Sequence, residues 1–419
     1  MRKVVLAGAL ALALLLWECA EGRAQEDRPP GQGEAPGKPR GKRWDDVSFY
    51  PIPAITSGRN EGTTYGLLGA FLFPDAEGQI DQLFSVQLAY RGIVGASGFV
   101  DYRNYMSDQA MFYAYTYEAA RVENENQVFY DDRRFLDQFN IRAEFHESRV
   151  TTDRFFGDGR ETLRSDESVM TSNTYQWEAR FGPNLTDSLS LQATVRARRF
   201  RVGRSLVEDI PQTLDAYSDT LGVEGGWALA EGVRLTYDTR DSFNTPTRGE
   251  YGNLFAEIAH YFPEGRRLPF QVFGLEAGKL WPFDEGGLVL VLHFQIRYVY
   301  GDAPFWELGT LGGGTTLRSF AGGRFHDDTA LLFNVEWRVR IVTLEIEGVQ
   351  GEVQLAPFAD LGELYDSPAH LFRKSFVDGF HYSYGMGIRG VVRPHIVGRV
   401  DMGYGTDGLA VTAGLDYPF

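Results

Sequence analysis

The chain has 419 residues, 48 of them glycine, with 14% aromatic residues and a formal net charge of -16. This acidic balance argues against a nucleic-acid partner, because phosphate backbones are bound by clustered Lys and Arg side chains. A mean hydropathy of -0.27 and the lack of a later run of about 18 apolar residues exclude a helical membrane protein.

The first residues are typical of a secretory signal peptide. A basic start precedes an apolar run from Val4 to Trp17, which is shorter than a spanning helix, and a small-x-small cleavage site follows at Gly22 to Ala24. We therefore expect residues 1–24 to be removed. A retained membrane anchor and a lipoprotein attached through Cys19 are the alternatives, and Glu18 disfavours the second. Loss of Cys19 would leave no thiol for a disulfide or a metal site.

The remainder of the chain divides into a short linker and one long domain. Residues 25–43 are rich in Pro, Gly and charge, which predicts a disordered linker. This linker leaves no room for a periplasmic domain. Residues 44–419 keep a uniform composition, so we expect one domain.

Strict alternation of apolar with polar or small side chains predicts β-strands throughout residues 44–419. The clearest segments are residues 84–90, 139–146, 175–181, 189–198 and 333–341. We interpret them as an all-β fold, a transmembrane antiparallel β-barrel of about 16 strands. A soluble sandwich also alternates, but the export signal and the C-terminus favour the barrel. In the last strand, Leu409 to Phe419, every second residue would face lipid, and Tyr417 and Phe419 would form a C-terminal insertion signal.

The alternation places eight strands before Asp241, three between Gly249 and Tyr300, and five after Thr329. With the N-terminus in the periplasm, the long external loops are expected at Glu147–Thr171, Val202–Leu221, Gly301–Thr329 and Gly362–Asp378. Ile93–Gly95 is then a short periplasmic turn. The connection Val122–Arg134 is longer than such a turn should be.

Three motifs in this domain indicate its family and candidate functional residues. The first is the Gly-rich run LGGGTTLRSF, which contains Gly312 and Gly313 and ends in Arg318, Ser319 and Phe320. No Gly-Lys-Ser/Thr follows it, which excludes a phosphate-binding loop. Simple flexibility is the alternative interpretation of this run.

The second motif is FADLG at residues 358–362, which ends in Gly362 and in which alternation turns Asp360 inward. Glu336 in the preceding predicted strand also faces inward. The third motif lies at a predicted periplasmic turn and contains the following residues: Asp238, Arg240, Asp241, Pro246 and Gly249. Proline and glycine suit a turn, and the charged residues suit a structural capping role.

Together these motifs resemble the barrel of the outer-membrane assembly and transport superfamily that includes BamA, TamA and the two-partner secretion translocators, also called the bacterial surface antigen family. The resemblance implies that the loop around Arg318 folds back into the lumen and that Arg318 pairs there with Glu336 and Asp360. Where the family has glycine at the loop tip, this chain has Ser319, which does not readily adopt the positive φ that glycine tolerates.

Catalytic motifs are missing from the sequence. It has neither a Gly-x-Ser-x-Gly elbow nor a His-Glu-x-x-His helix, so we expect no enzyme and no cofactor. The run His326-Asp327-Asp328 could bind a cation, but solvated loop acids are the better interpretation.

The leading hypothesis is assembly or translocation of proteins or lipids at the outer membrane of a Gram-negative bacterium. Its partners would be outer-membrane lipid, client proteins or lipids, and a separate periplasmic partner, since the family's periplasmic receptor domains are lacking. A passive or secretion pore and a structural surface antigen without transport are the alternatives. The last strand is expected to form a seam with the strand near Thr63–Phe73, made deformable by Gly403, Gly405 and Gly408.

Overall fold

The computed structural model describes residues 47–58, 60, 62–75, 79–346, 349–369 and 379–419. The predicted signal peptide, the linker and part of the loop Gly362–Asp378 lie outside these residues. Within the described part, no helix is long and apolar enough to cross a membrane.

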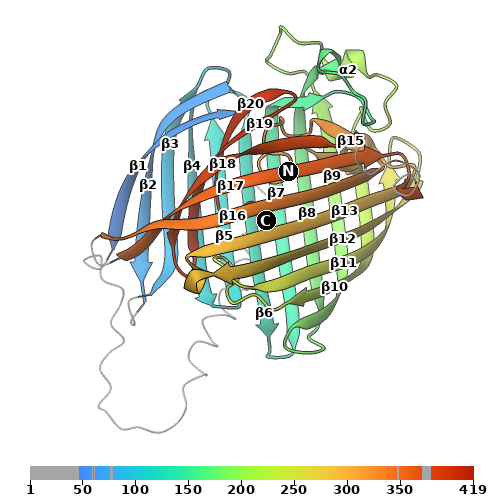
Figure 1. The fold of residues 1–419 in the computed structure, drawn as a ribbon. Coiled ribbons are helices and arrows are strands. Elements are labelled where there is room, and N and C mark those ends of the chain that lie inside the picture. Colours follow the sequence, from blue (N-terminus) through green and yellow to red (C-terminus); the bar gives the residue numbers. More distant parts are fainter. Residues whose placement is uncertain (1–46, 59, 61, 76–78, 347–348, 370–378) are drawn as a thin grey trace. The chain divides into compact units, whose positions relative to one another are not determined.

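In the described part of residues 48–419, the main element is one antiparallel sheet of 18 strands (Figure 1). Its strands are β1 (Ser48–Gly58), β2 (Gly62–Pro74), β3 (Ile80–Arg91), β4 (Gly95–Ser107), β5 (Ala110–Ala119), β6 (Asn124–Phe135), β7 (Phe139–Phe155), β8 (Ser168–Pro183), β9 (Leu189–Gly203), β10 (Gly226–Asp238), β11 (Gly249–Phe262), β12 (Leu268–Phe283), β13 (Leu288–Gly301), β16 (Thr329–Ile346), β17 (Val349–Tyr365), β18 (His381–Val392), β19 (Ile396–Gly405) and β20 (Gly408–Leu415). A separate hairpin pairs β14 (Gly309–Leu311) with β15 (Phe325–Asp327). Short helices are η2 (Arg164–Asp166), α2 (Thr213–Ala216), η3 (Asp284–Gly286) and η4 (Phe305–Glu307).

Consecutive strands pair around the sheet in chain order, with β13 pairing directly with β16. The ring closes where β20 returns to β1, and among the described residues this pairing consists of one residue pair, Ser57 and Val411. By contrast, β19 and β20 pair continuously from Gly398 to Gly405. The junction of the first and last strands, called the seam below, is therefore the shortest pairing between neighbouring strands in the described part of the sheet. The last strand meets β1, so the expected seam with residues 63–73 is wrong.

The two faces of the sheet have the polarity of a membrane barrel. Leu88 and Ile258 on the outer face are 71% and 56% exposed, whereas Glu336 and Arg389 on the inner face are 0% exposed. A water-soluble protein would place these groups the other way round. The outer face therefore suits lipid, and the lumen is polar.

The sheet of the described residues has two more strands than the predicted number of about 16, and both lie before Asp241. One is β1, which contains Pro51 and Pro53 and precedes the first predicted strand. Proline lacks an N–H donor, but an edge tolerates it, and β1 pairs continuously only with β2. The other is β6, inside the overlong connection Val122–Arg134. Its polar sequence NENQVFYDDRRF hides the alternation.

Because β1 is not among the predicted strands, the predicted direction of the strands before β6 is the reverse of the observed one. Ile93–Gly95 joins β3 to β4 at the same end as the long loops, so its assignment to the opposite end is wrong. Since β6 is also not among the predicted strands, the predicted and observed directions agree again from β7 onward. The long predicted loops accordingly join β7 to β8, β9 to β10, β13 to β16 and β17 to β18 at one end, called the loop end. The opposite end of the barrel, where the short connections lie, is called the turn end.

The C-terminus departs from the expected strand. β20 ends at Leu415, and Asp416 has a φ of 89°. The last residues then turn into the lumen, where the ring of Phe419 stacks on His293 with centroids 5.0 Å apart. The Tyr417 hydroxyl donates to Gln354 Oε1 over 3.1 Å. The expectation that Tyr417 and Phe419 face lipid is wrong, because the left-handed turn at Asp416 ends the alternation.

Candidate functional site: the loop held in the lumen

The segment 302–328, called the lumenal loop, joins β13 to β16 and contains η4 and the β14–β15 hairpin. Its glycines supply conformations that other residues rarely adopt: Gly312 and Gly313 have φ values of 114° and 102°. Among the charged residues of the loop, Glu307 and Arg318 fix it to different parts of the barrel wall.

Arg318 is the first anchor, and it is 1% exposed. Its Nη2 lies 2.7 Å from Asp360 Oδ1 on β17, and its Nη1 lies 2.6 Å from Glu336 Oε2 on β16. The backbone N–H of Arg318 also donates to Asp360 over 3.1 Å, and the guanidinium lies 3.5 Å from the ring centroid of Phe358. The structure thus brings together the residues that the family resemblance paired. Such forked bonds to carboxylates combine charge with a fixed geometry.

The anchor belongs to a larger buried network. Arg389 of β18 bridges Glu336 at 2.9 Å and Asp401 of β19 at 2.7 Å. Arg338 contacts Glu336 at 3.0 Å, and Arg399 contacts Asp401 at 2.8 Å. The network therefore joins the loop tip to four neighbouring strands, β16 to β19. Sequence alternation could have placed Arg389 and Asp401 inward, but it could not show that Arg389 bridges Glu336 and Asp401.

Ser319 occupies the tip without the strain expected of it. It is absent from the positive-φ residues of the described chain, so the lack of glycine does not disturb the backbone. Its N–H donates to Ser383 Oγ on β18 over 2.9 Å. The close approach of the loop tip to the barrel wall depends instead on Gly405 of β19, because a Cβ there would overlap the Ser319 hydroxyl.

Apolar contacts support the tip. Phe320 packs in a buried cluster with Leu311, Leu317, Phe325, Ala330, Leu332 and Leu364. Gly362 of β17 makes room for them, since a Cβ there would lie 2.8 Å from Leu311 and 3.2 Å from Leu317. This explains the glycine of the FADLG motif as a packing requirement.

Glu307 is the second anchor, and sequence reasoning missed it. It is 2% exposed and lies 2.8 Å from Arg196, 3.6 Å from Arg198 and 3.9 Å from Arg297. Burial alone would raise the pKa of Glu307, but Arg196 and Arg198 outweigh it and hold the pKa below its ordinary value. The inward arginines of β9 were a signal for such a partner, but the alternation could not identify it.

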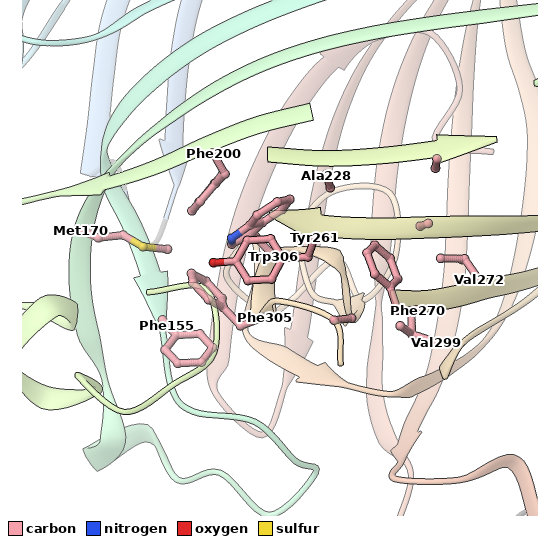
Figure 2. Close-up of a cluster of buried hydrophobic side chains, with 13 residues drawn as sticks. Phe155, Met170, Phe200, Ala228, Tyr261, Phe270, Val272, Val299, Phe305 and Trp306 are labelled. Atoms are coloured by element: carbon pink, nitrogen blue, oxygen red, sulfur yellow. The ribbon is translucent and has the colours of Figure 1, made fainter. Parts of the chain in front are cut away.

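The two residues that precede Glu307, Phe305 and Trp306, pack against aromatic side chains of the barrel wall (Figure 2). Trp306 stacks on Phe200 of β9 with centroids 5.3 Å apart and meets Tyr261 of β11 edge-on at 5.6 Å. Phe305 lies 4.6 Å from the ring of Phe155 on β7. The loop therefore contacts two parts of the barrel wall, strands β7–β13 and strands β16–β19.

Asp158, Asp327 and Asp328 lie close to one another near the loop end. Within the described residues, no group of three or more His, Cys, Asp or Glu is arranged to hold a metal ion. Burial lowers the pKa of His326 to about 4. Burial, with repulsion from Asp327 and Asp328, raises the pKa of Asp158 to about 6.

Ion pairs and hydrogen bonds of its own residues hold the turn between β10 and β11. Asp238 pairs with Arg240 at 2.8 Å and Arg133 at 2.6 Å. Asp241 accepts the N–H of Thr247 over 2.9 Å, Gly249 has a φ of 103°, and Pro246 is buried.

The same turn extends across the turn end to the β18–β19 connection. Thr245 Oγ1 donates to the carbonyl oxygen of Pro394 over 2.8 Å, and Arg393 Nη1 donates to that of Thr245 over 2.7 Å. The sequence predicted the turn but not these contacts.

Comparisons with known proteins agree with this architecture. The Omp85 superfamily domain matches residues 115–392. The chain resembles a crystal structure of BamA from Haemophilus ducreyi lacking POTRA domains 1–3, with 12% identity and a TM-score of 0.50, over 88% of this chain and 74% of that one. CdiB from Escherichia coli matches with 12% identity and a TM-score of 0.47, over 89% of this chain and 63% of that one. No curated protein sequence matches.

Proposed function

The chain belongs to the Omp85 superfamily, and on that premise we propose that it acts in the assembly or translocation of proteins or lipids at the outer membrane of a Gram-negative bacterium. Its partners would be outer-membrane lipid, the client protein or lipid, and a separate periplasmic partner. We propose a transport role without an enzymatic step.

The contrast between a firmly held loop and a narrow seam supports this proposal most strongly. Expelling the lumenal loop would break the buried pairs of Arg318 and Glu307. Separating β1 from β20 would break the pairing at Ser57 and Val411, which is one described residue pair against two buried charge clusters. Sideways passage between the first and last strands therefore costs less than passage through an emptied lumen. This favours a client that enters the membrane over a freely diffusing solute.

Depletion of the protein in its own host tests the function. We expect the amounts of particular outer-membrane proteins or surface lipids to fall, as measured by quantitative proteomics and lipid analysis of isolated outer membranes. Unchanged amounts of outer-membrane proteins and surface lipids would overturn the assembly proposal. A large and steady conductance of the purified protein in a planar bilayer would support the passive pore instead.

A disulfide across the seam tests the route. The substitutions Ser57→Cys and Val411→Cys place two thiols on paired positions, and oxidation should abolish complementation of the depletion until a reductant is added. The control is Met386→Cys with Met402→Cys, which pairs two positions of the continuous β18–β19 ladder. Equal activity of both oxidised proteins would exclude passage through the seam.

A further inference from the structure

Two of the cavities formed by the described residues lie against one half of the barrel wall. These two polar cavities, of about 220 and 520 Å³, are bordered mainly by strands β6 to β13. The tip anchor lies against the other half, β16 to β19. Any solute that enters these cavities therefore meets the β6–β13 wall.

This wall is cationic in a protein whose net charge is -16. Five arginines and three acids line the smaller cavity, and five arginines and four acids line the larger one. The arginines of the larger cavity are Arg154, Arg196, Arg198, Arg234 and Arg297. The positive surplus is thus a local property of the lumen.

The surplus centres on the arginines around Glu307. This one carboxylate lies within 4 Å of Arg196, Arg198 and Arg297. Arg196 also pairs with Glu257 at 3.0 Å, but the ion pairs of the described residues give Arg198 and Arg297 no other carboxylate. A charge shared among three guanidinium groups leaves much of their positive potential uncompensated.

Of the five arginines that line the larger cavity, Arg234 of β10 is the one without an ion pair among the described residues. Its guanidinium lies 4.6 Å from the ring centroid of Phe255, and no described carboxylate is in ion-pair contact with it. The Nε atoms of Arg234 and Arg198 are buried and lack a hydrogen-bond partner. Buried donors without acceptors are unfavourable, and an anion would satisfy them.

We propose that the larger cavity binds an anionic group, a carboxylate or a phosphate, with Arg234 at its centre and Arg198 and Arg297 beside it. Planar guanidinium groups bind both anions through paired N–H donors. This site does not depend on the proposed transport of protein or lipid.

Ligand-dependent thermal unfolding tests the site directly. The full chain in neutral detergent is titrated with inorganic phosphate at constant ionic strength, and we expect the unfolding temperature to rise with phosphate. Arg234→Gln should weaken the apparent affinity about tenfold, since a hydrogen bond to a charged group contributes to that extent. The matched control is Arg204→Gln, which removes the same charge from an exposed pair with Asp215.

Two comparisons decide the outcome. A phosphate effect of equal size in the Arg234→Gln and Arg204→Gln variants would overturn the site. So would the absence of stabilisation by inorganic phosphate and by mixed micelles containing phosphatidylglycerol. Stabilisation by inorganic phosphate in neutral detergent identifies a soluble anion as the ligand, whereas stabilisation by the anionic micelles alone identifies a lipid headgroup.

Discussion

Arg318 of the lumenal loop and Asp360 of β17 form a fully buried ion pair, with Nη2 and Oδ1 2.7 Å apart and 0% exposure of both side chains. The pair joins residues 42 positions apart, across the interface between the loop and the wall. Its neighbour Glu336 is shared with Arg338 and Arg389. A buried charge depends on its partners, so the loop position and the wall charges depend on each other.

Arg318→Ala should therefore release the loop tip. Removing the guanidinium leaves Asp360 and Glu336 with fewer counter-charges inside the lumen, a loss of about 3 to 5 kcal/mol for a broken buried pair. We expect faster cleavage of the lumenal loop by added protease and a lower unfolding temperature. Arg204→Ala, which breaks an exposed pair, should cost at most about 1 kcal/mol. Equal protease sensitivity of the two variants would contradict an anchoring role for Arg318.

Gly405→Ala should displace the same tip from the wall side. A Cβ at this position would overlap Ser319 Oγ and lie 2.6 Å from the carbonyl oxygen of Tyr382. Overpacking of this kind costs about 1 to 3 kcal/mol, so the loop should become more accessible to protease. Gly398→Ala on the same strand is the control, because nothing lies within 4 Å of its added Cβ. If both variants behave like the wild type, the tip does not need the close approach at Gly405.

The tip shows what alternation in the sequence can and cannot predict. Alternation places Glu336 and Asp360 inward because each strand has two faces, and the family resemblance supplied their partner Arg318. Neither could predict the contact of Glu307 with Arg196, since it depends on how a loop folds across the lumen. The inward turn of Phe419 depends on one backbone angle at Asp416, which alternation cannot detect.

Glu307→Gln should loosen the opposite side of the loop. The substitution keeps the size of the side chain but removes the charge that compensates Arg196, Arg198 and Arg297. Because a buried charge cluster loses a central partner, we expect destabilisation of a few kcal/mol, roughly that of a broken buried pair. Chemical denaturation followed by tryptophan fluorescence would measure it, since Trp306 is adjacent. Glu264→Gln, at an exposed position, should leave the midpoint unchanged, and the same midpoint in both variants would exclude this anchor.

Acidification should remove the contribution of Glu307 as well. Its pKa is lower in the folded protein than its ordinary value. The stabilisation is therefore present above the unfolded pKa and is lost as the pH falls through the folded pKa, which places the loss below about pH 4. In the Glu307→Gln variant this part of the pH profile should be flatter. A profile that keeps its wild-type slope would assign the acid transition to other carboxylates.

The acids at the loop end should respond to pH in the opposite direction. Burial, with repulsion from Asp327 and Asp366, raises the pKa of Asp328 to about 6, and burial with repulsion from Asp327 and Asp328 does the same for Asp158. An acid with a raised folded pKa binds its proton more tightly in the folded state. Its stabilisation is complete below the unfolded pKa of about 4 and is lost as the pH rises through the folded pKa.

Between about pH 4 and pH 6 the loop end should therefore become less stable as the pH rises. Limited proteolysis of the intact barrel at pH 5 and pH 7 would measure this, with faster cleavage expected at pH 7. Asp328→Asn should reduce the difference, because the amide stays neutral over this range and relieves the repulsion of Asp158. The protease activity at each pH is calibrated on an unfolded substrate. A wild type cleaved more slowly at pH 7, or an Asp328→Asn variant with the full pH dependence, would show that these acids do not control the loop end.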